Sequence, residues 1–92
     1  MRKKRVIIID VDLQVLETLK TLFDKLDYEL LTFNEPLTCP VYMENAQKCH
    51  KHDPCADIVI IDYYMPQMTG LQLLESQNQR GCKLSIINKA II

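Results

Sequence analysis

Two aspartates follow two matched apolar runs, and together they could perform phosphate chemistry. Asp10 comes directly after residues 6–9, and Asp62 comes directly after residues 58–61. Two carboxylates held close together repel, and one must take up a proton unless a cation lies between them. Mg²⁺ suits this role because it keeps several waters and binds phosphate oxygens. A carboxylate beside such an ion can attack an incoming phosphoryl group, since the ion offsets the repulsion between the two anions.

The apolar runs before the two aspartates predict strands of a parallel sheet. Residues 6–9 and 58–61 are β-branched throughout, and continuous apolar runs are typical of strands that are covered on both faces. Residues 28–33 predict a shorter strand near a sheet edge. Asp12 predicts the N-cap of a helix of about four turns, because apolar residues follow it at helical spacing. These residues are Val15, Leu16, Leu19, Leu22, Phe23 and Leu26.

The remaining elements are less regular. Three prolines interrupt residues 34–56, where the sequence predicts only a short helix over residues 41–47. A loop follows Asp62, and a helix begins near Leu71. Gly81 fits the C′ position of that helix, where a positive φ is favourable for glycine. The apolar segment 84–92 predicts a fourth strand.

Strands that alternate with helices predict a single α/β domain over residues 1–92 with a doubly wound parallel sheet. If the second and third strands lie on opposite sides of the first, the strand order reverses between the first and the third. Ligands bind outside the carboxyl ends of the strands at such a reversal. We therefore expect the carboxylates of Asp10 and Asp62 to converge there, which favours a metal-assisted phosphate site. Either aspartate alone would more simply be a helix cap or a turn residue.

The stretch that begins at Asp62 resembles the phosphoacceptor loop of response regulator receiver domains. In both, an aspartate is followed by Met-Pro, here Met65 and Pro66, and then by a glycine, here Gly70. Residues 6–10 are similar to the first strand of that family with its terminal acid. The resemblance follows the element order of the whole chain. It implies a flavodoxin-like fold with strand order 2-1-3-4, without the usual fifth strand within these residues.

The resemblance also implies a function in two-component signalling. A sensor histidine kinase or a phosphotransfer protein would transfer a phosphoryl group to Asp62, and the change would switch binding to a downstream protein. Asp10, Asp62 and the backbone carbonyl of Tyr64 would hold Mg²⁺. Pro66 and Gly70 would shape the loop. Because phosphorylation of Asp62 is a half-reaction, we do not expect an ordinary enzyme.

Two departures from the family pattern leave alternatives open. Val11 stands where the family usually has a second acid that contacts the metal, and Asp12 reads as a helix cap. The chain could therefore be a degenerate receiver that acts as a protein-interaction module without phosphorylation. The sequence given stops at Ile92, which would leave the fourth strand as an apolar sheet edge. Either the chain continues, or a homodimer or swapped oligomer covers this edge.

A third departure is a segment rich in thiols and imidazoles before the third strand. The three cysteines and two histidines of this segment could bind Zn²⁺, which favours four thiolate or imidazole ligands, although no C-x₂-C pair occurs. A redox pair of Cys49 and Cys55, or residues without a chemical role, are the alternatives. Cys82 is more simply a small packing residue. The five residues of the segment are Cys39, Cys49, His50, His52 and Cys55.

Composition limits the class of protein. The 92 residues are 48% hydrophobic and 25% charged, as in an ordinary globular domain. A net charge of −1 with interspersed signs gives no electrostatic basis for nucleic-acid binding, and the basic cluster at residues 2–5 reads as a solvated strand start. No apolar run is long enough for a membrane span or a signal peptide. We therefore expect a cytoplasmic protein with reduced cysteines.

Overall fold

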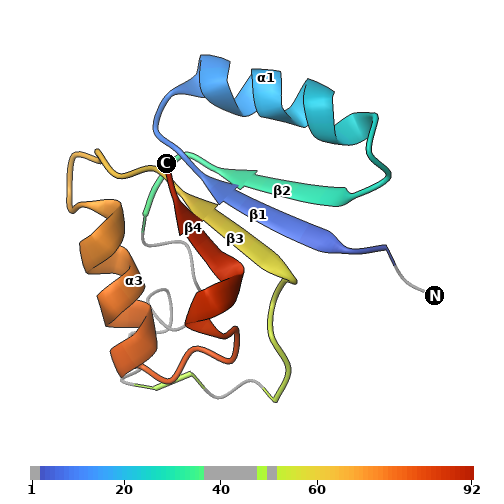
Figure 1. Cartoon of the computed structure of the whole chain (residues 1–92). Helices are drawn as coiled ribbons and strands as arrows, with labels where there is room; N and C mark the ends of the chain where they lie inside the picture. Colours follow the sequence, from blue (N-terminus) through green and yellow to red (C-terminus); the bar gives the residue numbers. More distant parts are fainter. Residues whose placement is uncertain (1–2, 37–47, 50–51) are drawn as a thin grey trace.

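Four parallel strands form one sheet in the order β2-β1-β3-β4 (Figure 1). The computed structural model describes residues 3–36, 48–49 and 52–92. Both the α/β class and the predicted strand order 2-1-3-4 are confirmed. The strands are β1 (Arg5–Ile9), β2 (Glu29–Phe33), β3 (Ile58–Ile61) and β4 (Lys89–Ile91).

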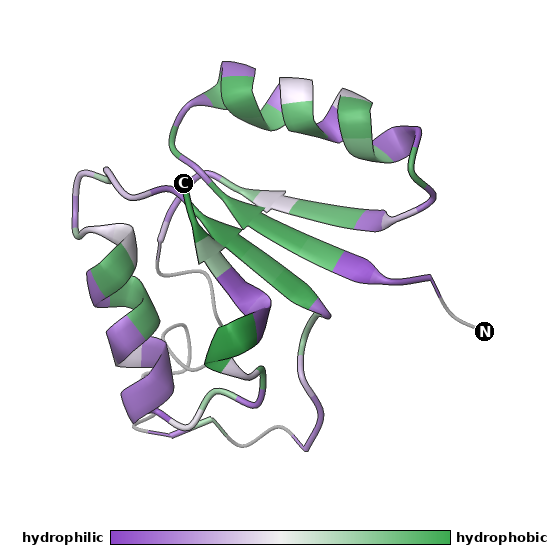
Figure 2. Ribbon diagram, in the orientation of Figure 1, coloured by the Kyte–Doolittle hydropathy of each residue, from purple (hydrophilic) through white to green (hydrophobic). Residues whose placement is uncertain are grey.

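Two helices cover opposite faces of the sheet, α1 (Leu13–Asp24) and α3 (Gly70–Gln79). Successive side chains of a strand point to opposite faces, so β1 contributes to both cores. Its Ile8 packs with Leu16 of α1, and its Ile9 packs in the cluster that holds Leu73 of α3. The apolar colouring of the central strands in Figure 2 reflects this double burial.

Helix α1 begins as predicted and ends early. The carboxylate of Asp12 accepts a hydrogen bond from the N–H of Gln14 at 2.9 Å, which confirms the N-cap. The helix has 12 residues, so the prediction of about four turns was too long. Leu22, inside it, and Leu26, beyond its end, are both half exposed. The apolar stripe is wider than the part of the sheet that α1 covers.

The predicted fourth strand over residues 84–92 was too long. The chain first forms a short 3₁₀ helix, η1 (Ile86–Asn88), and only Lys89–Ile91 pair with β3. Ser85 explains the difference, because its hydroxyl accepts from the N–H of Ile87 at 3.4 Å and its carbonyl accepts from the N–H of Asn88 at 3.0 Å. These bonds turn the chain before it can extend.

The end of α3 follows the sequence prediction. Arg80 is the C-cap, and Gly81 after it adopts φ +74°, the left-handed conformation expected at C′. The helix predicted over residues 41–47 lies outside the described residues. Within the described ranges, no helix has the length and apolar character needed to cross a bilayer.

Candidate functional site

Asp10 and Asp62 lie side by side where β1 and β3 end. The two strands are neighbours in parallel register, with Ile9 paired to Ile61. Just beyond that pair, the N–H of Asp62 donates to the carbonyl of Ile9 at 2.8 Å. On the other side, the N–H of Asp10 donates to the carbonyl of Phe33 in β2 at 3.0 Å. The sheet therefore fixes the backbone of both aspartates at the reversal of strand order, as the sequence predicted.

The side chain of Asp10 is buried against its acidic neighbours. It is 4% exposed, and its Oδ1 accepts a hydrogen bond from the N–H of Asp12 at 2.9 Å. Burial raises the pKa of Asp10 above 3.8, while the backbone hydrogen bond from Asp12 opposes the rise. The charge of Asp62 and a hydrogen bond to its side chain raise the pKa of Asp10 further. Burial and the nearby charge of Asp62 therefore both disfavour the ionised form of Asp10, and a cation beside the two residues would offset this cost.

The loop after Asp62 keeps its carboxylate accessible and oriented. Asp62 is only partly buried, so an incoming group can reach it. The N–H of Tyr64 donates to Oδ1 of Asp62 at 3.3 Å, which forms a local turn. The loop closes through a bridge between Tyr64 and Thr69 and through a 2.8 Å hydrogen bond from the N–H of Gly70 to the carbonyl of Tyr63.

Gly70 packs directly against the backbone of Asp62. A Cβ atom at this position would lie 2.5 Å from the carbonyl oxygen of Asp62 and 3.0 Å from Cγ2 of Ile61. Such a contact would force the start of α3 away from the site. The absence of a side chain therefore lets α3 support the strand end that carries Asp62.

Sequence reasoning missed the residues that anchor the start of α3. The hydroxyl of Thr69 accepts from the N–H of Gln72 at 3.1 Å, and Oε1 of Gln72 accepts from the N–H of Thr69 at 2.9 Å. This reciprocal pair is a capping box. Its sequence signal, a threonine followed three residues later by glutamine, could have been recognised beside the Asp62 motif.

Comparison with solved structures identifies the fold. A response regulator receiver domain from Methylobacillus flagellatus matches 91% of this chain with a TM-score of 0.68 and 18% identity. The response regulator TrrA from Thermotoga maritima, solved in complex with Mg²⁺-BeF, matches 96% with a TM-score of 0.65 and 20% identity. The receiver domain of the hybrid histidine kinase CckA matches 96% with a TM-score of 0.65 and 16% identity. The chain has the fold of a response regulator receiver domain.

The chain spans only part of the length of these structural relatives. The chain spans 64% and 65% of the first two proteins and 82% of the third. No protein-family model matches the sequence, and no curated protein matches it either. The likeness in structure therefore establishes the fold, and the chemistry must be argued from the residues of this chain.

The acidic pair of this receiver fold suits a hard divalent cation. Among the described residues, no group of three His, Cys, Asp or Glu side chains could hold a metal ion, so the site offers two carboxylates rather than three. Asp12 is occupied as the cap of α1, and Val11 contributes no carboxylate. Asp10 and Asp62 would hold Mg²⁺ with water, an oxygen-only donor set that this ion favours. The role of the Tyr64 carbonyl as a third ligand stays a prediction.

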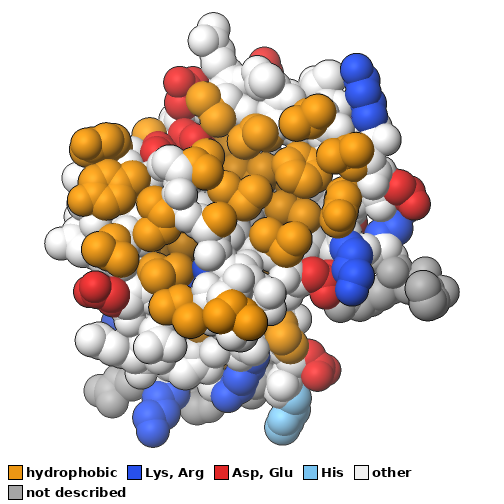
Figure 3. Space-filling model, in the orientation of Figure 1, with side chains coloured by type: hydrophobic (Ala, Val, Ile, Leu, Met, Phe, Trp, Pro, Cys, Tyr) orange, Lys and Arg blue, Asp and Glu red, His pale blue; other side chains and the backbone are white. Residues whose placement is uncertain are grey.

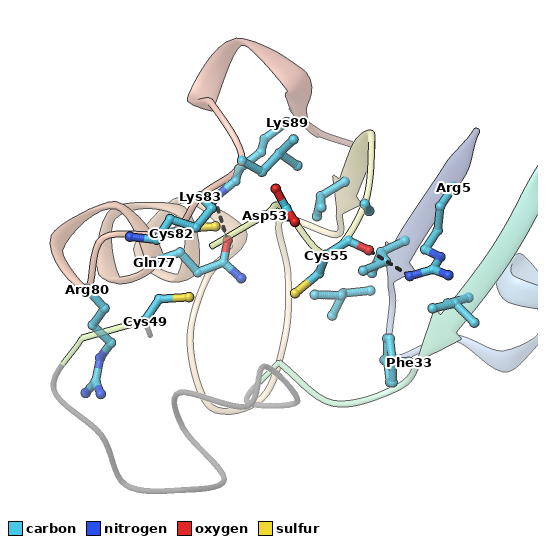
Figure 4. Close-up of a pocket in the computed structure, with 16 residues that line it drawn as sticks. Arg5, Phe33, Cys49, Asp53, Cys55, Gln77, Arg80, Cys82, Lys83 and Lys89 are labelled. Atoms are coloured by element: carbon cyan, nitrogen blue, oxygen red, sulfur yellow. Dashed lines mark hydrogen bonds between the residues drawn. The ribbon is translucent and has the colours of Figure 1, made fainter. Parts of the chain in front are cut away.

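The described cysteines lie away from this site, on the α3 face of the sheet. Cys49, Cys55 and Cys82 are free thiols that line one cavity of about 310 Å³. Figure 4 shows them on separate segments around the buried Gln77, whose Oε1 accepts a 3.0 Å hydrogen bond from Nζ of Lys89.

The zinc prediction is only partly covered by the structure. Cys39 and His50 lie outside the described residues. The other three predicted ligands, Cys49, His52 and Cys55, belong to no cluster of three metal-binding side chains among the described residues. Cys82 packs against the core formed with α3, which confirms its predicted packing role.

Proposed function

We propose that this chain is a signal receiver that accepts a phosphoryl group on the carboxylate of Asp62 with the help of Mg²⁺. The donor would be the phosphohistidine of a sensor kinase or a phosphotransfer protein in the cytoplasm, and the readout would be altered binding to a downstream protein. The position of Asp10 and Asp62 at the adjoining carboxyl ends of β1 and β3 carries the proposal. The receiver fold and the Mg²⁺-BeF complex of the structurally similar TrrA support it.

Each residue of the pair has a distinct part in this chemistry. A carboxylate oxygen of Asp62 forms the new O–P bond while the N–P bond of the donor histidine breaks, and the released imidazole takes up a proton. Asp62 can act as the nucleophile because it is partly exposed, whereas Asp10 is 4% exposed and out of reach. Mg²⁺, held by both carboxylates, would offset the charge that builds on the phosphoryl oxygens. Since the transfer is stoichiometric, the chain is not an ordinary enzyme.

Intact-mass spectrometry after incubation with acetyl phosphate tests the proposal. The parent chain should gain one phosphoryl group in the presence of Mg²⁺ and none with a chelator. Asp62→Asn should abolish the gain, because an amide oxygen is a poor nucleophile. Asp53→Asn is a matched control, since it removes an exposed aspartate that precedes β3, whereas Asp62 follows the other end of that strand. Phosphorylation of Asp62→Asn, or phosphorylation of the parent chain that does not depend on Mg²⁺, would refute the assignment of Asp62 as the phosphoryl acceptor.

A second candidate function is a protein-interaction module that is not phosphorylated. The specific observation in its favour is that the carboxylate of Asp12 is engaged as a cap while Val11 occupies the neighbouring position. With one carboxylate fewer than the receiver pattern, the site could fail to hold Mg²⁺. Titration calorimetry with MgCl₂ separates the candidates: saturable binding that disappears in Asp10→Asn supports the phosphoacceptor, and no saturable binding supports the module.

A further inference from the structure

The cavity of about 310 Å³ on the α3 face of the sheet is separate from the two aspartates, because neither Asp10 nor Asp62 lines it. Small-molecule sites in proteins have volumes of about 300 to 1000 Å³ and are mostly apolar, with a few polar groups that orient the ligand. The size of this cavity falls at the lower end of that range. Its floor consists of apolar side chains from three neighbouring strands: Ile7, Ile9, Leu31, Phe33 and Val59.

The register of the sheet places one lysine in this apolar surface. Leu31, Ile7 and Val59 form a row across β2, β1 and β3, and Lys89 of β4 is the next member of the row. Residues paired directly across neighbouring strands lie on the same face of a sheet, so Lys89 faces α3 together with the other three. Its side chain is only partly exposed. Because a positive charge is costly to hold beside apolar groups, an anion at this position would be stabilised.

Gln77 of α3 is buried, and Lys89 fixes the orientation of its amide group. The side chain is 7% exposed, and its Oε1 accepts the 3.0 Å hydrogen bond from Nζ of Lys89. An ammonium group can only donate, so the amide oxygen must face Lys89 and the Nε2 amino group must point elsewhere. Figure 4 shows the amide of Gln77 projecting from α3 into the cavity. The two residues together therefore present an ammonium group and an amide N–H donor to the cavity.

The charges around the cavity also favour an anion. Among the described lining residues four are basic and one, Asp53, is acidic, although the whole chain has a net charge of −1. Arg5 is paired with Glu29 at 3.2 Å, whereas Lys89 is bonded to the neutral Gln77 and keeps its charge in place. Figure 3 shows basic side chains on the surface near the end of α3. The four basic lining residues are Arg5, Arg80, Lys83 and Lys89.

We infer that this cavity binds a small monocarboxylate with an apolar body, of the size of a medium-chain fatty acid. The carboxylate accepts hydrogen bonds from Nζ of Lys89 and Nε2 of Gln77, and the apolar body lies on the floor formed by β1, β2 and β3. A neutral apolar molecule would leave the charge of Lys89 without a counter-charge. A polyanion such as a nucleotide would place further charges against the apolar floor, which is unfavourable.

NMR titration of the protein with octanoate tests the inference. Nitrogen–proton correlation spectra should show saturable shifts of the Gln77 side-chain amide and of backbone amides around the cavity, with smaller changes in α1, which covers the opposite face. Octanol has the same chain without the charge. Its dissociation constant should be at least about tenfold higher, because a charge-assisted hydrogen bond is stronger than a neutral one.

Two variants separate the polar contacts from the apolar floor. Gln77→Glu keeps the acceptor for Lys89 and replaces the amino donor with a negative charge, so it should weaken octanoate binding at least about tenfold and leave octanol binding nearly unchanged. Lys89→Met keeps an apolar stem and removes the charge, so it should act in the same way. Lys20→Met, which replaces an exposed lysine of α1, is the matched control and should affect neither ligand. The dispersion of each spectrum verifies that the variant is folded.

Absence of saturable octanoate binding at millimolar concentration would overturn the inference. So would equal affinities for octanoate and octanol, an octanoate affinity that is unchanged in a folded Gln77→Glu or Lys89→Met variant, or an equal loss of affinity in Lys20→Met.

Discussion

Replacement of Asp10 by asparagine should stabilise the fold in the absence of divalent cations. The pKa of Asp10 is raised above 3.8 chiefly by burial and then by the charge of Asp62. Between 3.8 and the raised value the folded state binds more protons than the unfolded state, so the free energy of unfolding falls as pH rises through that window. Above this pH window, the full free-energy cost of ionising the buried Asp10 carboxyl group destabilises the folded state; we call this cost the ionisation penalty. Asp10→Asn removes the ionisable group and therefore the penalty.

The size of the effect follows from the surroundings of the carboxyl group. Two unit charges about 4 Å apart repel by about 4 kcal/mol at an effective dielectric constant of about 20. Water around the partly exposed Asp62 reduces this repulsion. An asparagine oxygen still accepts the hydrogen bond from Asp12, although a neutral acceptor is weaker than a charged one by about 1 kcal/mol. We expect a net gain of about 1 to 2 kcal/mol near neutral pH.

Urea unfolding, followed by circular dichroism, measures the gain. The advantage of Asp10→Asn should be full at neutral pH with a chelator and should shrink as pH falls toward 3.8. Added Mg²⁺ should stabilise the parent and not the variant, because ligands stabilise the state that binds them. Glu75→Gln, which removes an exposed carboxylate of α3, controls for net charge and should change little. If Asp10→Asn is less stable than the parent at neutral pH, or if its advantage does not depend on pH, the carboxyl groups do not repel as argued.

Three further variants test the support of the site by urea unfolding. Gly70→Ala should lower the free energy of unfolding by about 1 to 3 kcal/mol and slow the phosphorylation of Asp62, because the added Cβ would clash with the carbonyl of Asp62. Unchanged stability and an unchanged rate of phosphorylation would contradict the close packing. Thr69→Ala should lower the free energy of unfolding by about 1 kcal/mol by removing the cap, whereas Thr69→Ser should keep most of it. Leu73→Ala should lower it by about 2 to 5 kcal/mol, because the side chain is fully buried; a loss below 1 kcal/mol would place Leu73 outside the core.

The convergence of the two aspartates could be predicted because it depends on topology rather than on detailed packing. Continuous β-branched runs indicate buried parallel strands. Once residues 6–9 and 58–61 are neighbouring strands, the residues after them must meet at one rim. The pairing of Ile9 with Ile61, and the hydrogen bond from the N–H of Asp62 to the carbonyl of Ile9, are the structural counterpart of that argument.

Features that depend on competition between local bonds could not be predicted in this way. The composition of segment 84–92 suits a strand and a short helical turn equally well, and the hydrogen bonds of Ser85 favour the helical turn η1. Likewise, the apolar stripe of α1 does not reveal how much of the stripe will be buried against the sheet. The cavity lined by Cys49, Cys55 and Cys82 joins segments that are distant in sequence, so only the tertiary structure reveals it.

The backbone around Asp62 limits where a charge-driven change can occur under the proposed function. The N–H of Asp62 is bonded to Ile9, the N–H of Tyr63 is bonded to Ile92, and Gly70 packs against the Asp62 carbonyl. These contacts hold the nucleophile against two strands and one helix. The loop of residues 64–69 follows this anchored strand end, and the N–H of Tyr64 donates to the carboxylate that would be modified. A phosphoryl group on Asp62 would compete for that donor, so the first response should be a rearrangement of Tyr64, whose side chain is 79% exposed and free to report it to a partner.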